Sequence, residues 1–260
     1  MWATAIKQQK GLNMNIRYIT CSDPRNHNHI YELFDLWQID PRVEIAVQMH
    51  PGKVSPDTDR YKWIEHIFHD LYGLPHQNLA IHVNSDWCDD ICNGKIPDAL
   101  KPLFDAYSYS LQPIVKRIQL NMPQKTAENF NPQKLKPVIN AYNDKEFIIQ
   151  YKPITINAVQ QLHKIGTKFS LLFDESGGTG RDATTWRAPV YPYFHPQGYS
   201  GGMSPENVAE NLTKISRIAG AHDIWIDAEG KLKTDDKFDP NRAAAYIRNA
   251  LAWEQKQNQK

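Results

Sequence analysis

The chain has 260 residues, of which 41% are hydrophobic and 23% charged, and its formal net charge at pH 7 is +1. This length is enough for one sizeable core, and the near-neutral charge creates no global field that would favour nucleic acid or an anionic membrane. No apolar run approaches the length of a membrane span. We therefore expect a globular protein, monomer or homodimer, that binds neither nucleic acid nor membranes.

The three cysteines, Cys21, Cys88 and Cys92, are too few for a disulfide framework and fit a reducing, cytoplasmic location. Cys88 and Cys92 could lie one helical turn apart, but no second ligand pair accompanies them, so we expect no metal there. Residues 1–13 lack the apolar core of a secretory signal. We expect them to form an N-terminal tail that could be disordered, outside a domain over residues 14–260.

Short apolar runs alternate with longer amphipathic stretches along the chain. The eight runs that predict strands are Ile16–Thr20, Val43–Met49, Leu79–Asn84, Arg117–Asn121, Phe147–Lys152, Phe169–Asp174, Gln197–Ser200 and Asp223–Asp227. Between most of them lie helix-like segments, among them Ile30–Trp37, Arg60–Leu71 and Pro205–Ile218. Ser204 is the expected N-cap of the third of these helices, and Asp239-Pro240 opens a last helix in the same way.

Eight strands alternating with helices predict an α/β fold with a parallel sheet. At this length a single (β/α)8 TIM barrel is the leading expectation, and an open doubly wound sheet is the alternative. No G-x-G-x-x-G follows the first strand, which weakens a dinucleotide-binding interpretation. We expect no cofactor.

The stretch Phe169–Val208 carries the strongest functional signal. Its first part is an apolar run that ends in Asp174 and is followed by Gly177, Gly178 and Gly180. Its second part is the Gly201-Gly202 turn before a predicted helix start. Helix N-termini and glycine loops after strands present backbone N–H groups that attract anions. Tight turns explain the first glycine cluster better, whereas the second favours a bound phosphate.

In a (β/α)8 barrel the catalytic and substrate-binding residues lie at the C-terminal ends of the strands. The polar residues at those positions are Cys21, Gln48 or His50, His82 or Asn84, Asn121, Gln150 or Lys152, Asp174, Ser200, and Asp227 with Glu229. A carboxyl at an apolar strand end suits general acid work, although Asp174 could instead be a structural hydrogen-bond acceptor. Cys21 could act as a thiolate base or be an inert buried thiol.

A divalent metal site is a further alternative for the strand-end acids. It would use Glu44, His82, Asp227 and Glu229. Their spacing matches no ligand pattern, so we expect hydrogen-bonded structure or substrate contacts from these residues and no metal.

The chain resembles phosphoribosylanthranilate isomerase, a (β/α)8-barrel enzyme of tryptophan biosynthesis. The family's Leu-Leu-Asp strand end, its Gly-Gly-Ser/Thr-Gly loop and a following Trp correspond to LLFD ending at Asp174, to GGTG and to Trp186. The family's Gly-Gly-Leu-x-Pro-Glu-Asn-Val corresponds to GGMSPENV, which begins at Gly201. Its Val-Gln-Leu-His and Ile-Cys-Gly strand ends correspond to Ile118–Asn121 and to Ile19–Ser22.

The resemblance implies an Amadori rearrangement of a small phosphorylated substrate, from an aminoaldose phosphate to an aminoketose phosphate. It implies Asp174 as the general acid, Cys21 as the base, and Gly201 and Gly202 as part of the phosphate site. The substrate-binding residues that we expect with them are Asn121, Gly178, Asp227, Glu229 and His82.

The eighth strand departs from the family's pattern. It reads WIDAEG over Trp225–Gly230 where the family has Asp-Val-Ser-Ser-Gly, and it places two acids beside the expected phosphate pocket. The family's arginine after the second strand corresponds to Lys53 or Arg60. The alternatives to isomerase chemistry are a divergent relative acting on a related small phosphorylated molecule, a non-catalytic metabolite-binding barrel and a metal-dependent barrel enzyme.

Overall fold

The computed structural model describes residues 14–71, 77–175, 181–190 and 196–259. Eight parallel strands follow one another around a closed barrel in chain order, and β1 pairs with β8. The strands are β1 Asn15–Ser22, β2 Val43–Met49, β3 Asn78–Asn84, β4 Val115–Asn121, β5 Glu146–Tyr151, β6 Ser170–Asp174, β7 Gln197–Ser200 and β8 Asp223–Ala228. The fold is therefore the predicted (β/α)8 barrel, because closure by the β1–β8 pair rules out the open sheet.

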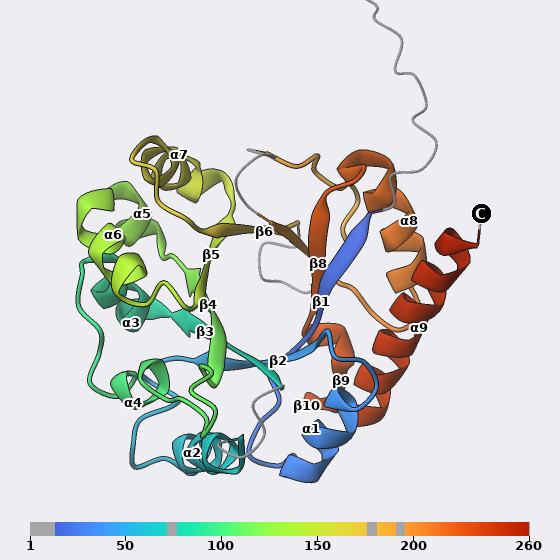
Figure 1. The fold of residues 1–260 in the computed structure, drawn as a ribbon, viewed down its shortest axis with the longest axis horizontal. Helices are drawn as coiled ribbons and strands as arrows, with labels where there is room; N and C mark the ends of the chain where they lie inside the picture. Colours follow the sequence, from blue (N-terminus) through green and yellow to red (C-terminus); the bar gives the residue numbers. More distant parts are fainter. Residues whose placement is uncertain (1–13, 72–76, 176–180, 191–195, 260) are drawn as a thin grey trace, which may run out of the picture.

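Helices lie outside the ring of strands (Figure 1), with α8 and α9 packed together beside β1. The α-helices are α1 Ile30–Trp37, α2 Asp59–Leu71, α3 Ser85–Cys92, α4 Lys101–Phe104, α5 Gln124–Glu128, α6 Pro132–Ala141, α7 Ile156–Lys164, α8 Val208–Ala219 and α9 Pro240–Asn258. Two short 3₁₀ helices, Pro153–Thr155 and Gly230–Leu232, and a small hairpin, β9 Lys233–Thr234 with β10 Lys237–Phe238, complete the described elements.

Helix starts follow the capping signals in the sequence, with one difference. The Asp239 side chain accepts hydrogen bonds from the backbone N–H groups of Asn241 and Arg242, so α9 begins as predicted. Ser204 likewise accepts from two backbone N–H groups, at 3.2 and 3.3 Å, but the residues after it form a turn. Helix α8 therefore starts at Val208, three residues later than predicted.

The strands are apolar because both of their faces are buried. Side chains that point outward pack beneath the helices, and side chains that point inward fill the barrel. Tyr18, Ile148, Leu172 and Trp225 form an apolar cluster of their own. Trp225 fits beside β7 because Gly198 has no side chain: a Cβ on Gly198 would lie 2.0 Å from Cε2 of the indole.

Gly198→Ala is expected to destabilise the barrel by about 3 kcal/mol, because overpacking a full core forces side chains or backbone to shift. Urea unfolding would show this as a lower midpoint at unchanged slope. Gly52→Ala is the matched control, since the added methyl would meet no atom nearer than 3.7 Å. Equal midpoints for the two variants would contradict the prediction.

The expected N-terminal tail, residues 1–13, lies outside the described residues. Of the helices in the described ranges, none combines the length and the apolar composition that crossing a bilayer requires.

Candidate functional site

A cavity of about 570 Å³ opens at the C-terminal mouth of the barrel. Every strand contributes to its wall through its last residues or the turn that follows. The predicted site residues that line the cavity are Asp174, Asn121, His82, Gly201, Gly202, Asp227 and Glu229. Gly178 falls outside the described residues. Strand ends far apart in the sequence thus meet in one polar cavity.

Cys21 does not line this cavity. Its neighbours Thr20 and Ser22 point into the barrel, where they donate hydrogen bonds to Glu44 and Asp227. Side chains alternate along a strand, so Cys21 points outward, into the apolar layer beneath the helices. Burial, and then the negative charge of Asp227, raise the pKa of its thiol well above the usual value. The expectation of a thiolate base facing the cavity therefore fails.

Asp227 faces the cavity, as Cys21 was expected to do. It lies on β8, is 8% exposed, and its Oδ1 accepts a hydrogen bond of 2.6 Å from the Ser22 hydroxyl. Burial raises its pKa from 3.8 to about 7, and the neighbouring charge of Glu229 adds to the effect. A carboxyl with this pKa can both accept and release a proton near neutral pH.

Asp174 ends β6 and shares one level of the barrel with Asp227. Asp174 pairs with Ser200 of β7, and Ser200 pairs with Asp227 of β8, so the two acids are two strands apart in register. Gln150 of β5 donates a hydrogen bond of 2.8 Å to Oδ2 of Asp174. Asp174 and Asp227, two of the carboxyls that line the cavity, therefore lie in different hydrogen-bonding environments, a pattern that divides acid and base roles in many enzymes.

A row of amide side chains forms the opposite wall. Gln119 donates to Asn121 at 2.8 Å, Asn121 donates to Asn84 at 3.0 Å, and Asn84 donates to Gln48 at 2.9 Å. Gln48 donates in turn to Glu229 at 3.0 Å. The sequence identified most of this row by strand-end position. Gln119 was not predicted, because it lies two residues before the end of β4 and points into the barrel at a deeper level than Asn121.

His82 is 3% exposed and lies on β3 within the cavity wall. Burial lowers the pKa of its imidazole to about 3, and the positive charge of Arg117 acts in the same direction. His82 is therefore neutral at physiological pH.

A cationic cluster surrounds Asp23 at the edge of the cavity. Arg25, Arg60 and Lys233 each place a nitrogen 2.7–2.8 Å from its carboxylate, whose side chain is 3% exposed. Burial alone would raise the pKa of Asp23, but the hydrogen bonds from Arg25 and Lys233 outweigh it and lower the pKa. This cluster was not predicted from the sequence, although an aspartate directly after the first strand is a signal for it.

Both candidates for the second-strand cation, Lys53 and Arg60, line the cavity. Arg60 reaches back from α2 to Asp23 and to the carbonyl oxygen of Gln48. Both residues thus stay candidates for the cation predicted after β2.

The fold itself requires glycine in the Gly201-Gly202 turn. Gly202 has φ +63°, and a Cβ there would lie 2.5 Å from the carbonyl oxygen of Arg181. The N–H group of Ser204 bonds to the Asn207 side chain at 2.8 Å. The glycines therefore permit a close approach of two chain segments, and the turn also forms part of the cavity wall.

The four residues of the alternative metal site do not come together in the structure. Glu44 lies deep in the barrel with its Oε1 2.8 Å from Nη1 of Arg117, away from the cavity wall. Over the described ranges no group of three or more His, Cys, Asp or Glu side chains is arranged to hold a metal ion.

Asp227→Asn is expected to make the protein more stable at pH 8. The pKa of Asp227 is higher in the folded chain than in the unfolded one, so its contribution to stability is present below pH 3.8 and is lost as the pH rises to about 7. Asparagine removes the buried charge and keeps the size. Thermal melts at pH 4, 6 and 8 should show a stabilisation that grows with pH; a melting temperature at or below that of wild type at pH 8 would contradict this.

Comparisons with protein-family models and with curated protein sequences find no match to this chain. Among solved structures, N-(5'-phosphoribosyl)anthranilate isomerase from Pyrococcus furiosus is similar with a TM-score of 0.52 and 12% identity, over 90% of this chain and 98% of that one. A citrate lyase from Burkholderia xenovorans is similar with the same TM-score and identity, over 94% of this chain and 84% of that one. At this identity the likeness shows the fold alone, which is the TIM barrel.

Proposed function

We propose that this protein is an isomerase of the phosphoribosylanthranilate isomerase type, or a divergent relative of it, that moves a proton within a small phosphorylated, polyhydroxylated molecule. The observation that supports this most is Asp227, whose pKa is raised to about 7 in the same cavity as Asp174. Proton transfer is most efficient when the catalytic pKa lies near the working pH.

The two carboxyls have separate tasks in this proposal. Asp174 protonates the ring oxygen and opens the sugar, which is the role that the resemblance implies. Asp227, as the carboxylate, takes the proton from the second carbon. The electrons of that C–H bond form a double bond between the first and second carbons, and the electrons of the C=N bond left by ring opening move onto the nitrogen. Asp227, after exchange with solvent, returns a proton to the first carbon. The hydroxyl of the second carbon gives its proton to Asp174, which ring opening left as a carboxylate, and becomes the carbonyl. Asp227 thus replaces Cys21 as the base.

The remaining walls fit a polar, anionic substrate. The amide row from Gln119 to Gln48 offers both donors and acceptors to neighbouring hydroxyls. Arg25, Lys53 and Arg60 line the cavity on the side of β1 and β2, away from Asp174 on β6. These three cations are the groups that attract a phosphate to this side, and the acids Asp23, Asp227 and Glu229 lie close to them because β8 pairs with β1.

The test is proton exchange with solvent. The protein is incubated in D2O with phosphoribosylanthranilate, then with other aminosugar and sugar phosphates, and NMR detects product and deuterium at the first carbon of that product. We expect both with wild type, and loss of both with Asp227→Asn. Asp98→Asn is the control, because Asp98 is a surface residue paired with Lys101.

A substrate that binds with neither turnover nor exchange would overturn the isomerase proposal and favour the metabolite-binding barrel. Full activity in Asp227→Asn would instead overturn the assignment of the base.

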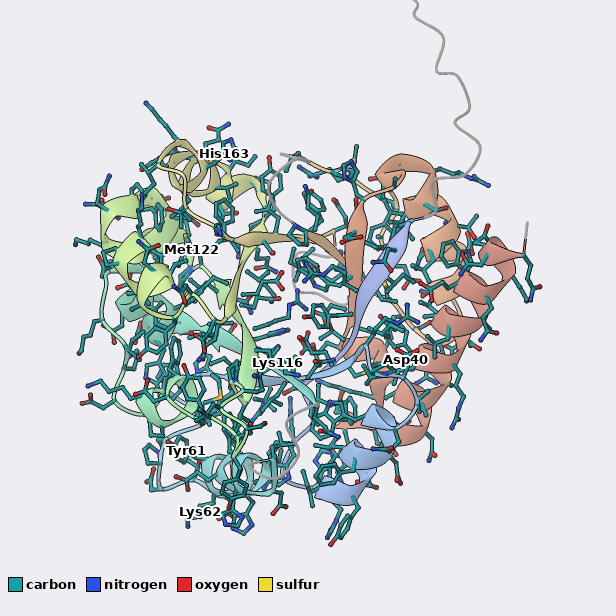
Figure 2. The ribbon with its side chains drawn as sticks, in the orientation of Figure 1. Asp40, Tyr61, Lys62, Lys116, Met122 and His163 are labelled. Atoms are coloured by element: carbon teal, nitrogen blue, oxygen red, sulfur yellow. The ribbon has the colours of Figure 1, made fainter. Side chains whose placement is uncertain are left out.

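Lys53→Ala is expected to raise KM about fivefold for a phosphorylated substrate and to leave kcat unchanged, since an exposed ion pair contributes up to about 1 kcal/mol. The control is Lys62→Ala, because Lys62 lies on α2 at the periphery of the molecule (Figure 2) and does not line the cavity. Steady-state kinetics at 20 and 200 mM salt would measure both. An equal KM in the two variants would show that the phosphate binds elsewhere.

A further inference from the structure

The amide row has a fixed direction, because backbone carbonyl groups determine how one member points. The side-chain nitrogen of Asn84 donates to the carbonyl oxygen of His82 at 2.9 Å and to that of Met49 at 3.3 Å. A carbonyl oxygen only accepts, so the amide nitrogen of Asn84 must face these groups. Its side-chain oxygen accepts from Asn121 on the other side. The orientation of Asn84 is therefore settled by its surroundings.

Asn84 in turn orients Gln48. The Asn84 nitrogen lies 2.9 Å from Oε1 of Gln48, and the Gln48 nitrogen lies 3.0 Å from the Glu229 carboxylate. Turning the Gln48 amide over would place nitrogen against nitrogen on one side and oxygen against carboxylate oxygen on the other. The Nε2 atom of Gln48 therefore also faces Nδ1 of His82, at 3.3 Å.

An amide nitrogen cannot accept a hydrogen bond, so Nδ1 of His82 must be the acceptor. In a neutral imidazole the proton then resides on Nε2. Within the part of the chain that the structure describes, Nε2 has no hydrogen-bond partner, and His82 is part of the cavity wall. The row thus leaves one N–H donor available to a molecule in the cavity.

The charged groups around His82 come from three elements. Arg117 lies on β4, Asp23 follows β1, and Glu229 follows β8 and shares Gln48 with the imidazole. Burial and Arg117 lower the pKa of His82, and Asp23 opposes them with a smaller effect. The neutral ring is the form that the hydrogen bonds require.

We propose that His82 is a catalytic residue that donates a hydrogen bond from Nε2–H of a neutral imidazole to the oxygen on the second carbon of the substrate, which gains negative charge as its hydroxyl gives up its proton and the carbonyl forms. This rests on the proposed function. A donor held in place before the reaction stabilises the developing charge without reorganisation, and a neutral imidazole can polarise a carbonyl group in this way. Gln48 is the positioning residue that holds the tautomer.

Nitrogen-15 NMR of histidine-labelled protein tests the ring itself without any substrate. We expect the His82 signals, assigned by their absence in His82→Gln, to show a neutral ring protonated on Nε2 from pH 8 down to about pH 4. Gln48→Leu should release the constraint and give a mixture of tautomers. A ring protonated on Nδ1, or a cationic ring at pH 6, would overturn the proposal.

Kinetics test the donation. His82→Leu should lower kcat by a factor of about 10² to 10³ with little change in KM, as expected for loss of one preorganised donor. His82→Gln, whose amide can place an N–H near the position of Nε2, should recover part of the loss. His163→Gln is the control, since His163 lies on the outer helix α7 (Figure 2). Equal kcat in His82→Leu and wild type would overturn the proposal.

The two proposals fail in different ways. Wild-type protein that turns over no substrate would refute the proposed isomerase activity, and the NMR spectra would still decide the tautomer. Turnover that depends on Asp227 and not on His82 would leave the isomerase proposal standing and remove His82 from it.

Discussion

Asp227→Asn is expected to lower kcat by a factor of about 10² to 10⁴, the usual contribution of a positioned proton-transfer group. Asparagine keeps the shape of the side chain and can still accept the hydrogen bond from Ser22, so the fold should remain. The loss arises because the amide cannot take the proton from the second carbon. Asp174→Asn should cause a loss of the same order, because ring opening then lacks its acid.

The pH dependence separates the base from a merely structural acid. Burial raises the pKa of Asp227 to about 7, and a base must be ionised to accept a proton, so kcat/KM of the wild type should rise as the pH increases through about 7. That rise should disappear in the residual activity of Asp227→Asn. A rise that persists in the variant would assign the titration to another group.

The same substitution is expected to stabilise the protein at pH 8, so one residue should change activity and stability in opposite directions. Buried charge at a catalytic position commonly costs stability. An Asp227→Asn variant that is both inactive and less stable at pH 8 would instead indicate a structural role for this carboxyl.

Arg117→Met is expected to have the largest effect on stability, a loss of about 3 to 5 kcal/mol. Arg117 is 1% exposed and lies inside the barrel between the rings of Tyr18 and Trp225, 4.4 and 4.2 Å from their centroids. Its Nη1 is 2.8 Å from the carboxylate of Glu44, and its Nε is 3.3 Å from that of Glu146. Methionine would fill the space but leave the buried Glu44 without its cation.

Glu44 determines how the stability loss of Arg117→Met changes with pH. Burial already raises its pKa, against the attraction of Arg117, and removing Arg117 should raise it further. A carboxyl with a raised pKa loses its contribution to stability as pH increases, so Arg117→Met should be more destabilised at pH 8 than at pH 5.

Urea unfolding at both pH values measures the effect of Arg117→Met. The double variant Arg117→Met/Glu44→Gln is the control, because removing both charges should restore part of the stability. A single variant as stable as the wild type would contradict the prediction, as would a double variant no better than the single one.

The sequence by itself determined the elements and their order. Each apolar run predicted a strand within two residues of its observed ends, because strands buried on both faces need continuous apolar residues. Asp239-Pro240 predicted the start of α9, because capping is a local interaction. Eight strands in 260 residues then favoured the barrel. The strand-end rule also brought Asp174, Asn121 and Asp227 to the cavity, since the ends of parallel strands meet at one mouth.

Only the tertiary structure decided what those residues can do. Cys21 stands near a strand end, but the alternation along β1 turns it outward, and a shift of one residue in a strand reverses the face. The raised pKa of Asp227 comes from burial and from the charges of Glu229, Glu44 and Asp174, and the cluster around Asp23 joins residues up to 210 positions apart. The tautomer of His82 depends on hydrogen bonds passed from Asn84 through Gln48. These properties arise between strands, where local sequence carries no signal.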